Sequence, residues 1–364
     1  QESPVPLNPV ETEEEALSIF HLRSRVTSTS VTVRDFDWTR PQNPFESRVP
    51  AEPPDPDREV YQHSELSITG YDRDGAAAYT EVDDKRQAEV ILQALAQSRA
   101  LFVGRGTVTG FRPGKTFKFE SAALGEQTYL LTNVAHELPL SEASEAGAVE
   151  APSVSPSDVA AGESTLTYRN RFECIRFDEE VPYRPPRKTG KPRITGMQTA
   201  TVVGPTEPQE DVYTDEHGRI KVRFHWDRLA TGNDKSSCWI RVAQSWAGPG
   251  FGTLFLPRIN MEVLVTFLEG DPDRPLVVGC VYNGFNLLPA DHEMPDNKTK
   301  SFIRTSSSPG NDGYNEVMFE DAKGEELISV HAQKDYDEVV ENDHRTEVRN
   351  DQTNQVKANQ SESV

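Results

Sequence analysis

The sequence predicts a mainly β protein: a first β-barrel module with one helix, a small OB-type barrel, and a C-terminal intertwined β-helix. Three observations carry this prediction. Apolar and polar residues alternate along many short segments, as they do in half-buried strands. The chain holds 26 Pro and 23 Gly in 364 residues, which favours frequent turns over long helices. Finally, Val recurs at a fixed spacing through a polar C-terminal tail.

The first module, predicted over 1–190, contains short strands and one helix. The helix is predicted across 83–100, where apolar residues recur at helical spacing and Asp83 or Asp84 can cap its start. Residues 41–57 hold six prolines and are expected to form a loop. The predicted strands lie around Leu17, Ile19, Leu22, Val26, Val31 and Val33, and over 115–120, 129–135 and 168–177.

Two stretches of unusual composition close this first module. Residues 141–164 are small and acidic and contain no Lys or Arg, which predicts a disordered segment. Residues 181–193 (VPYRPPRKTGKPR) are rich in proline and carry a local basic run. Such stiff, polar segments are typical of linkers, so the sequence predicts a domain boundary near 185–193.

The second module, predicted over 191–285, reads as a five-stranded barrel of the OB type. Strict alternation from Ile220 to Trp226 predicts a half-buried strand with Trp226 in the barrel interior. The segment 261–268 is apolar enough to be covered on both faces. The other strands are predicted over 196–203, 239–243 and 276–281.

The tail carries an eight-residue repeat, because Val340, Val348, Val356 and Val364 are evenly spaced and almost everything between them is polar. A chain that buries one Val per repeat cannot build a core alone. It has to stack on itself or on copies of itself. The sequence therefore predicts a β-helical shaft over 311–364 with these four valines in its core, preceded by a linker over 286–310.

Composition limits the function classes. The net charge is −21 and the isoelectric point is about 4.8, so phosphate backbones and anionic membrane surfaces are repelled. OB-type barrels can bind single-stranded nucleic acid through aromatic and basic groups. Here 194–285 contains more acidic than basic residues, so no nucleic-acid partner is expected.

Motifs of export and of thiol chemistry are also absent from the sequence. It shows no signal peptide. It also contains no apolar run that approaches about 18 residues, the length of a membrane span. It begins without Met, so a fragment is expected. Cys174, Cys238 and Cys280 have no metal-site spacing and are expected to be packing thiols from a reducing compartment.

No catalytic, cofactor or metal motif emerges from the sequence. His136-Glu137 begins like the HExxH zinc motif, but position 140 is Leu and Pro139 would break the required helix. The sequence therefore predicts no enzyme, no cofactor and no metal. With 59 Asp and Glu residues, however, a hydrolytic carboxylate pair stays open as an alternative.

One long run closely resembles a known family. The segments ITGMQTATVVGP, DVYTDEHGRIKVRFHWDR and SCWIRVAQSWAGPGFGTLFLPRINMEVLVTFLEGDPDRPLVVGCVYNG are similar to VgrG, the valine-glycine repeat spike protein of type VI secretion. This family resembles the hub and spike of contractile phage tails. The likeness continues more loosely through 111–140, the YRNRFECI segment and NEVMFEDAKGEELISVHAQKD. It departs at PRINMEV, where Asn260 stands in place of the more usual Gly.

The resemblance implies a parallel homotrimer with a hub part, an OB-fold neck and a triple-stranded β-helix shaft. It further implies a non-catalytic spike that punctures target membranes and delivers effectors. The implied partners are an Hcp-like tube hexamer at the hub and a PAAR-type tip protein. The implied location is synthesis in the bacterial cytoplasm and secretion through the type VI apparatus. A first hub portion and any further C-terminal domain are expected to be missing.

Three alternatives to the type VI spike stay open. The same architecture occurs in the spike of a tailed phage or of an extracellular injection particle. A cell-wall hydrolase is the alternative from the enzyme class. An OB-type nucleic-acid binder is the third.

Overall fold

The computed structural model divides the chain into two compact units, which are described in turn: 1–195 with 267–274, and 196–266 with 275–364. The predicted disordered segment 141–164, the candidate cap Asp83 and the repeat residue Val364 lie outside the described residues. The described residues are 4–7, 14–36, 38, 41–42, 45–52, 55–63, 84–121, 125–138, 168–179, 182–207, 210–310 and 312–361.

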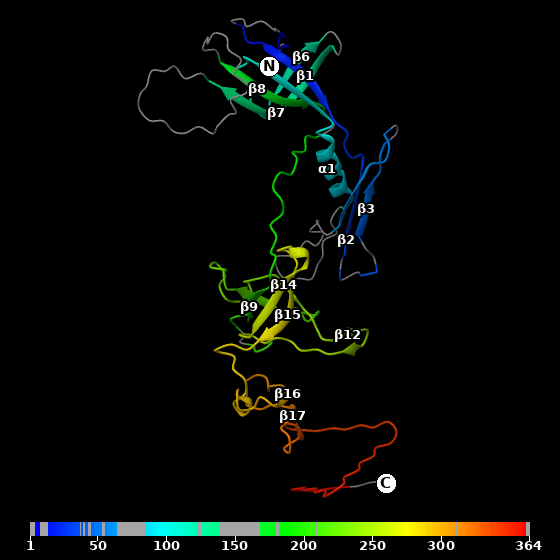
Figure 1. The fold of residues 1–364 in the computed structure, drawn as a ribbon, viewed down its shortest axis with the longest axis vertical. Helices are drawn as coiled ribbons and strands as arrows, with labels where there is room; N and C mark the ends of the chain where they lie inside the picture. Colours follow the sequence, from blue (N-terminus) through cyan, green and yellow to red (C-terminus); the bar gives the residue numbers. More distant parts are fainter. Residues whose placement is uncertain are drawn as a thin grey trace, which may run out of the picture. The chain divides into compact units, whose positions relative to one another are not determined.

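A five-stranded antiparallel sheet dominates the first unit (Figure 1). Its order is β1-β5-β8-β7-β6. Val5 bridges to Phe119 of β6 and Leu7 bridges to Leu17 of β1, so the N-terminal segment joins the two edge strands and closes the sheet. The predicted β-barrel part is thereby confirmed. The strands are β1 (Leu17–Ser24), β5 (Ala100–Gly106), β6 (Thr116–Ser121), β7 (Gly125–Glu137) and β8 (Arg169–Arg176).

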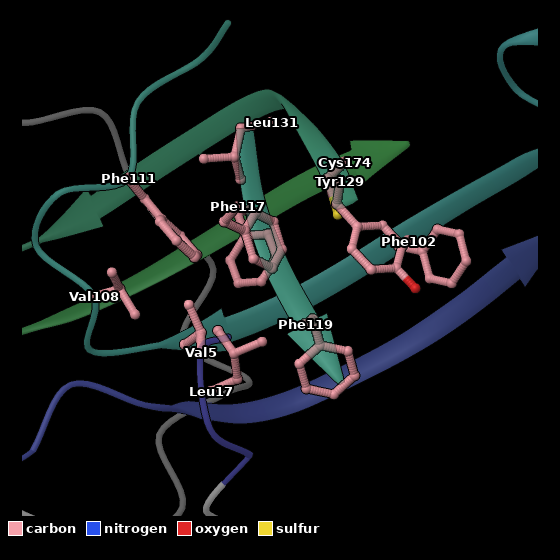
Figure 2. Close-up of a cluster of buried hydrophobic side chains, with 11 residues drawn as sticks. Val5, Leu17, Phe102, Val108, Phe111, Phe117, Phe119, Tyr129, Leu131 and Cys174 are labelled. Carbon is pink, nitrogen blue, oxygen red and sulfur yellow. The ribbon is translucent and has the colours of Figure 1, made fainter. Parts of the chain in front are cut away.

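Aromatic side chains fill this barrel (Figure 2). The rings of Phe117 and Tyr129 lie 5.6 Å apart, and Phe117 meets Phe172 edge-on at 5.7 Å. Aromatic pairs in such geometries add to the free energy gained from burying their area. Cys174 is also buried here, and burial raises the pKa of its thiol. Of the three cysteines, only Cys174 is a buried packing thiol; Cys238 and Cys280 are exposed, contrary to the prediction.

A second layer of the first unit packs α1 (Asp84–Ala96) on a three-stranded sheet of order β3-β2-β4. Val31, Val33, Ala88 and Ile91 form its core, which confirms the predicted helix and its apolar face. The prediction that 41–57 is only a loop is wrong, because β3 lies inside it. The six prolines of 41–57 lie outside FESRV, so every N–H of that strand can pair. The strands are β2 (Ser30–Asp35), β3 (Phe45–Val49) and β4 (Glu59–His63).

The predicted five-stranded OB-type barrel is confirmed in residues 198–281. Its sheet order is β10-β9-β14-β15-β11, and a bridge between Ile220 and Ile240 joins the two outer strands and closes it. The 267–274 turn between β14 and β15, with the short helix η2 (Leu268–Gly270), is counted with the first unit. The strands are β9 (Gln198–Val203), β10 (Lys221–Phe224), β11 (Arg241–Val242), β14 (Glu262–Phe267) and β15 (Pro275–Val281).

Trp226 is not in the barrel interior, so that prediction is wrong: its side chain is 63% exposed. The strand ends at Phe224 and a turn follows, so the alternation of inward and outward side chains stops before Trp226 is reached. Its ring stacks on Phe224 at 5.3 Å, and its Nε1 donates to Oε1 of Gln198 at 2.9 Å. Valine and isoleucine side chains, among them Ile220 and Val222, fill the interior instead.

Beyond the barrel, residues 286–310, expected to be a linker, contain the short helix η3 (Ala290–His292) and the strand β16 (Lys300–Arg304). This strand begins a three-stranded antiparallel sheet with β17 (Glu316–Glu320) and β18 (Leu327–His331). A small hairpin of β12 (Ala247–Gly248) and β13 (Phe251–Gly252) leaves the barrel. Among the described residues, no helix is long and apolar enough to cross a membrane.

Candidate functional site

The tail repeats structurally as well as in sequence. Bends fall at 333–334, 341–342, 349–350 and 357–358, and the residues between them form neither helix nor strand. Val340, Val348 and Val356 each stand immediately before a bend, so they occupy one position of the repeat. Their side chains are 45%, 47% and 51% exposed in the single chain.

Over the described part of the tail, the backbone pairs with no other segment of its own chain. No strand is assigned within the described residues 332–361. Backbone N–H and C=O groups need hydrogen-bond partners, and an extended chain without a neighbouring strand leaves them to water or to another chain. The tail therefore offers both a row of valines and a free backbone for pairing with other copies.

The sheet β16-β17-β18 adds a second apolar surface directly before the tail. Ile303, Val317 and Val330 stand opposite one another across the three strands and thus lie on one face. Phe319 and Ile328 form the next row on that face. All five side chains are exposed. Contiguous exposed apolar surface of this kind marks an interaction site. We call these five residues the apolar sheet face.

The opposite face of the same sheet carries a cluster of charged side chains packed against η3. Phe302 stacks on the ring of His292 from η3, with ring centroids 4.1 Å apart. His292 is almost fully buried, and its Nε2 lies 2.9 Å from Oε2 of Glu316. Arg304 donates through Nε to the same carboxylate oxygen at 2.5 Å and through Nη1 to Asp291 at 2.8 Å. We call Asp291, His292, Arg304 and Glu316 the junction cluster.

Interactions within the junction cluster lower the pKa values of both of its carboxyl groups. Burial raises the pKa of the Glu316 carboxyl, but hydrogen bonds from Arg304 and His292 outweigh it and leave that pKa below its usual value. Hydrogen bonding to Arg304 lowers the pKa of Asp291 to about 2. The same bonds to both carboxylates raise the pKa of Arg304. Both acids are therefore ionised at neutral pH.

This arrangement favours neither a metal nor a catalytic acid. Ligand atoms of Asp291, His292 and Glu316 lie within 4.8 Å of one another, as in a cation site. However, the guanidinium of Arg304 bonds both carboxylates and lies 3.3 Å from Nε2 of His292, so a cation already fills that space. A glycosidase acid requires a carboxyl with a raised pKa, whereas both carboxyls here have a lowered one.

Sequence reasoning named only part of this surface. Val340, Val348 and Val356 were named, and Val364 lies outside the described residues. The sequence does not predict the apolar sheet face, because Ile303 lies in the predicted linker and the other four residues lie in the predicted shaft outside the valine octads. The signal was present in three short runs with apolar centres, SFIR, EVMFE and LISVH, each too short to stand out by itself.

Three families match consecutive parts of the chain. Residues 2–140 match the phage tail baseplate hub family. Residues 209–282 match the injector OB domain of type VI secretion systems and phage baseplates. Residues 301–364 match the C-terminal trimerisation domain of bacteriophage T4 gp5. The order of these matches follows the barrel, the OB fold and the tail described above.

Individual relatives cover almost the whole chain. Type VI secretion system spike protein VgrG4b of Pseudomonas aeruginosa is 40% identical over 95% of this chain and 41% of its own length. VgrG5 of the same species is 37% identical over 90% of this chain and 39% of its own length. The actin cross-linking toxin VgrG1 of Vibrio cholerae is 33% identical over 91% of this chain and 28% of its own length. The chain thus spans less than half of each relative.

A solved structure is similar over part of the chain. It is the E. coli c3393 protein, described as a component of the type VI secretion system with similarity to T4 tail proteins gp27 and gp5. The two chains are 21% identical with a TM-score of 0.35, over 56% of this chain and 45% of that one. A superposition this partial supports no conclusion about function.

Together, the closed barrel, the OB fold and the trimerisation match define a hub-and-spike protein of the phage-tail type. The predicted family resemblance is confirmed. The chain matches the hub, OB and trimerisation families in that order, and over most of its length it is similar to VgrG spike proteins of type VI secretion.

Proposed function

We propose that this chain forms the homotrimeric spike at the tip of a type VI secretion tube, where it punctures target membranes and delivers effectors without catalysis. The observation that carries the proposal is that the apolar sheet face and the tail valines are both exposed in a single chain. The same residues, 301–364, match a trimerisation domain. Burying each such side chain is worth about 1.5–3 kcal/mol, which only association can recover.

Trimerisation also accounts for the unpaired backbone of the tail. Three parallel copies wound together would pair each extended segment with neighbours and would remove exposed strand edges. One Val from each copy would then meet in every layer of the shaft. Such a shaft is narrow and resists bending because its backbone groups are paired along its length. Penetration of a membrane by this shaft requires a driving force behind it and no active site.

The partners follow from the same proposal. The first-unit barrel, whose strands other than β8 lie in the hub match, would rest on a hexameric tube of the Hcp type. The free end of the shaft would carry a PAAR-type tip protein and effectors. The chain would be made in the bacterial cytoplasm and leave it through the type VI apparatus. The domain limits we propose are a hub module over 1–190, a neck over 191–285, and a shaft to which the valine octads within 311–364 belong.

Other function classes have less support. A cell-wall hydrolase would require a carboxyl with a raised pKa, whereas hydrogen bonds from Arg304 lower the pKa of Asp291 and Glu316. Trp226 and Trp246 are exposed on the OB barrel, as in nucleic-acid binders, but the net charge of −21 opposes a phosphate backbone. A tailed phage or injection-particle spike shares the fold. The relatives described as type VI spike proteins favour the secretion system.

The first experiment is the mass of the purified chain by light scattering during size-exclusion chromatography. We expect a particle of three chains, and a monomer at micromolar concentration would overturn the proposal. Zymography on peptidoglycan should show no clearing; clearing by the purified chain would revive the hydrolase. In a type VI-active bacterium that lacks its own spike gene, the full-length gene should restore release of the tube protein, and the same gene without 301–364 should not.

A further inference from the structure

A second uncharged surface lies on the OB barrel, away from the shaft. Residues 246–257 (WAGPGFGTLFLP) contain no charged side chain, in a chain where 27% of residues are charged. They include the hairpin of β12 and β13, which Figure 1 shows at the side of the barrel opposite β9. The large apolar side chains Trp246, Phe251, Leu254 and Phe255 are all exposed. We call this segment the arm.

The arm has a defined shape. The rings of Trp246 and Phe251 meet edge-on, with centroids 5.4 Å apart. A Cβ at Gly248 would lie 2.3 Å from the Phe251 ring, so glycine is what allows that ring to lie across the hairpin. Gly250 and Gly252 have φ of +82° and +143°, a region that glycine occupies without strain. A preformed arm loses little conformational entropy when it binds, which favours a role in binding.

The same unit contains a pocket that the arm does not enter. It has a volume of about 970 Å3 and is lined by the end of β9, the end of β15 and the 282–287 loop. Cys280, Tyr282, Phe285 and Leu287 are exposed around it, and no residue of the arm contributes to its lining. Its size suits the insertion of several apolar side chains.

We infer that the arm of one copy inserts into the pocket of the next copy around the threefold axis. In a closed ring, each subunit presents one surface to the neighbour before it and a different surface to the neighbour after it. The chain offers such a pair: an uncharged apolar projection, and a hollow at the ends of β9 and β15 that is lined by apolar side chains together with Glu210, Asp211 and Arg258. This inference rests on the proposed trimer and adds a second, lateral interface at the OB barrel to the one along the shaft.

A disulfide between copies tests this contact, because Cys280 already lines the pocket and is exposed. Phe251→Cys places a thiol near the tip of the arm, and Cys238→Ser removes the other exposed thiol. After oxidation with copper-phenanthroline, we expect covalent dimers and trimers on a non-reducing gel. Pro249→Cys, at the turn of the hairpin, should cross-link as well and keeps the Phe251 ring.

Controls separate this contact from the trimer itself. The ladder should vanish when Cys280→Ser is added to the arm variant. Lys235→Cys, an exposed position in neither the arm nor the pocket, should give no ladder. If light scattering shows a trimer but neither arm variant cross-links, the lateral contact is overturned and the trimer stands. A monomeric wild type would overturn both. If Phe251→Cys loses the trimer while Pro249→Cys still cross-links, the result would support the contact.

Discussion

Arg304 and Glu316 face each other across β16 and β17, and Nε of Arg304 donates to Oε2 of Glu316 at 2.5 Å. The two side chains are 15% and 8% exposed. Arg304 also bonds Asp291, and His292 bonds Glu316, so the four residues of the junction cluster form one network. The cluster lies behind the apolar sheet face. It connects η3 to β16 and β17, the strands with which the trimerisation match begins.

Arg304→Met should destabilise the chain, because it leaves the Glu316 carboxylate buried without its cation. Breaking a buried ion pair from one side costs about 3–5 kcal/mol. Urea unfolding followed by fluorescence measures the change. Lys334→Met breaks a fully exposed pair with Asp335 and should change the midpoint very little. The double variant Arg304→Met with Glu316→Leu should regain most of the loss; a double variant as unstable as the single one would contradict this account.

The junction cluster should also make the free energy of unfolding depend on pH in the acidic range. The ordinary pKa values of Glu316 and Asp291 are 4.5 and 3.8, and both are lowered in the folded chain, that of Asp291 to about 2. A lowered carboxyl pKa contributes stability that is complete above the ordinary value and is lost as the pH falls through the folded one. Unfolding free energy should therefore decline from pH 4.5 towards pH 2. The variant Glu316→Gln should show a shallower decline; an unchanged slope would exclude Glu316 as a source.

Val348→Asp should disrupt the shaft. In a trimer it would place three carboxylates in one layer and remove apolar burial worth about 1.5–3 kcal/mol per chain. Light scattering should show a shift from trimer towards monomer as the protein is diluted. Asn350→Asp is the matched control, since it adds the same charge at the bend two residues away. A Val348 variant that stays trimeric at every concentration would place this valine outside the shaft core.

Asn260 should tolerate glycine but not alanine. Its φ is +72°, a left-handed conformation in which Asn and Gly are favoured and a β-carbon without a polar group is strained. Asn260→Ala should cost about 1–2 kcal/mol. Asn260→Gly, which restores the residue more usual in the resembling family, should stay within about 0.5 kcal/mol of the wild type. Equal stabilities of the two variants by urea unfolding would argue against strain at this position.

Much of the secondary structure follows from local patterns. The helical spacing from Ala88 to Ile91 predicted α1, and alternation predicted the strands on which the OB barrel is built. Local patterns failed to locate a strand that lies between prolines and the end of another strand. Phe45–Val49 forms β3 between prolines, and Trp226 leaves the barrel because β10 stops two residues earlier. The ends of strands depend on the partner strand, which a local pattern does not contain.

By itself, the sequence determined the β class, the OB barrel, the octad spacing of Val340, Val348 and Val356, and the family resemblance. Each of these features can be recognised from neighbouring residues or from one contiguous run of sequence. Only the tertiary structure decided three other features. Val5 and Leu7 close the first barrel, Ile303, Val317 and Val330 share one exposed face, and Arg304 bonds both carboxylates beside His292. These features depend on the register between strands far apart in the chain. A shift of one residue in that register would turn each side chain to the other face.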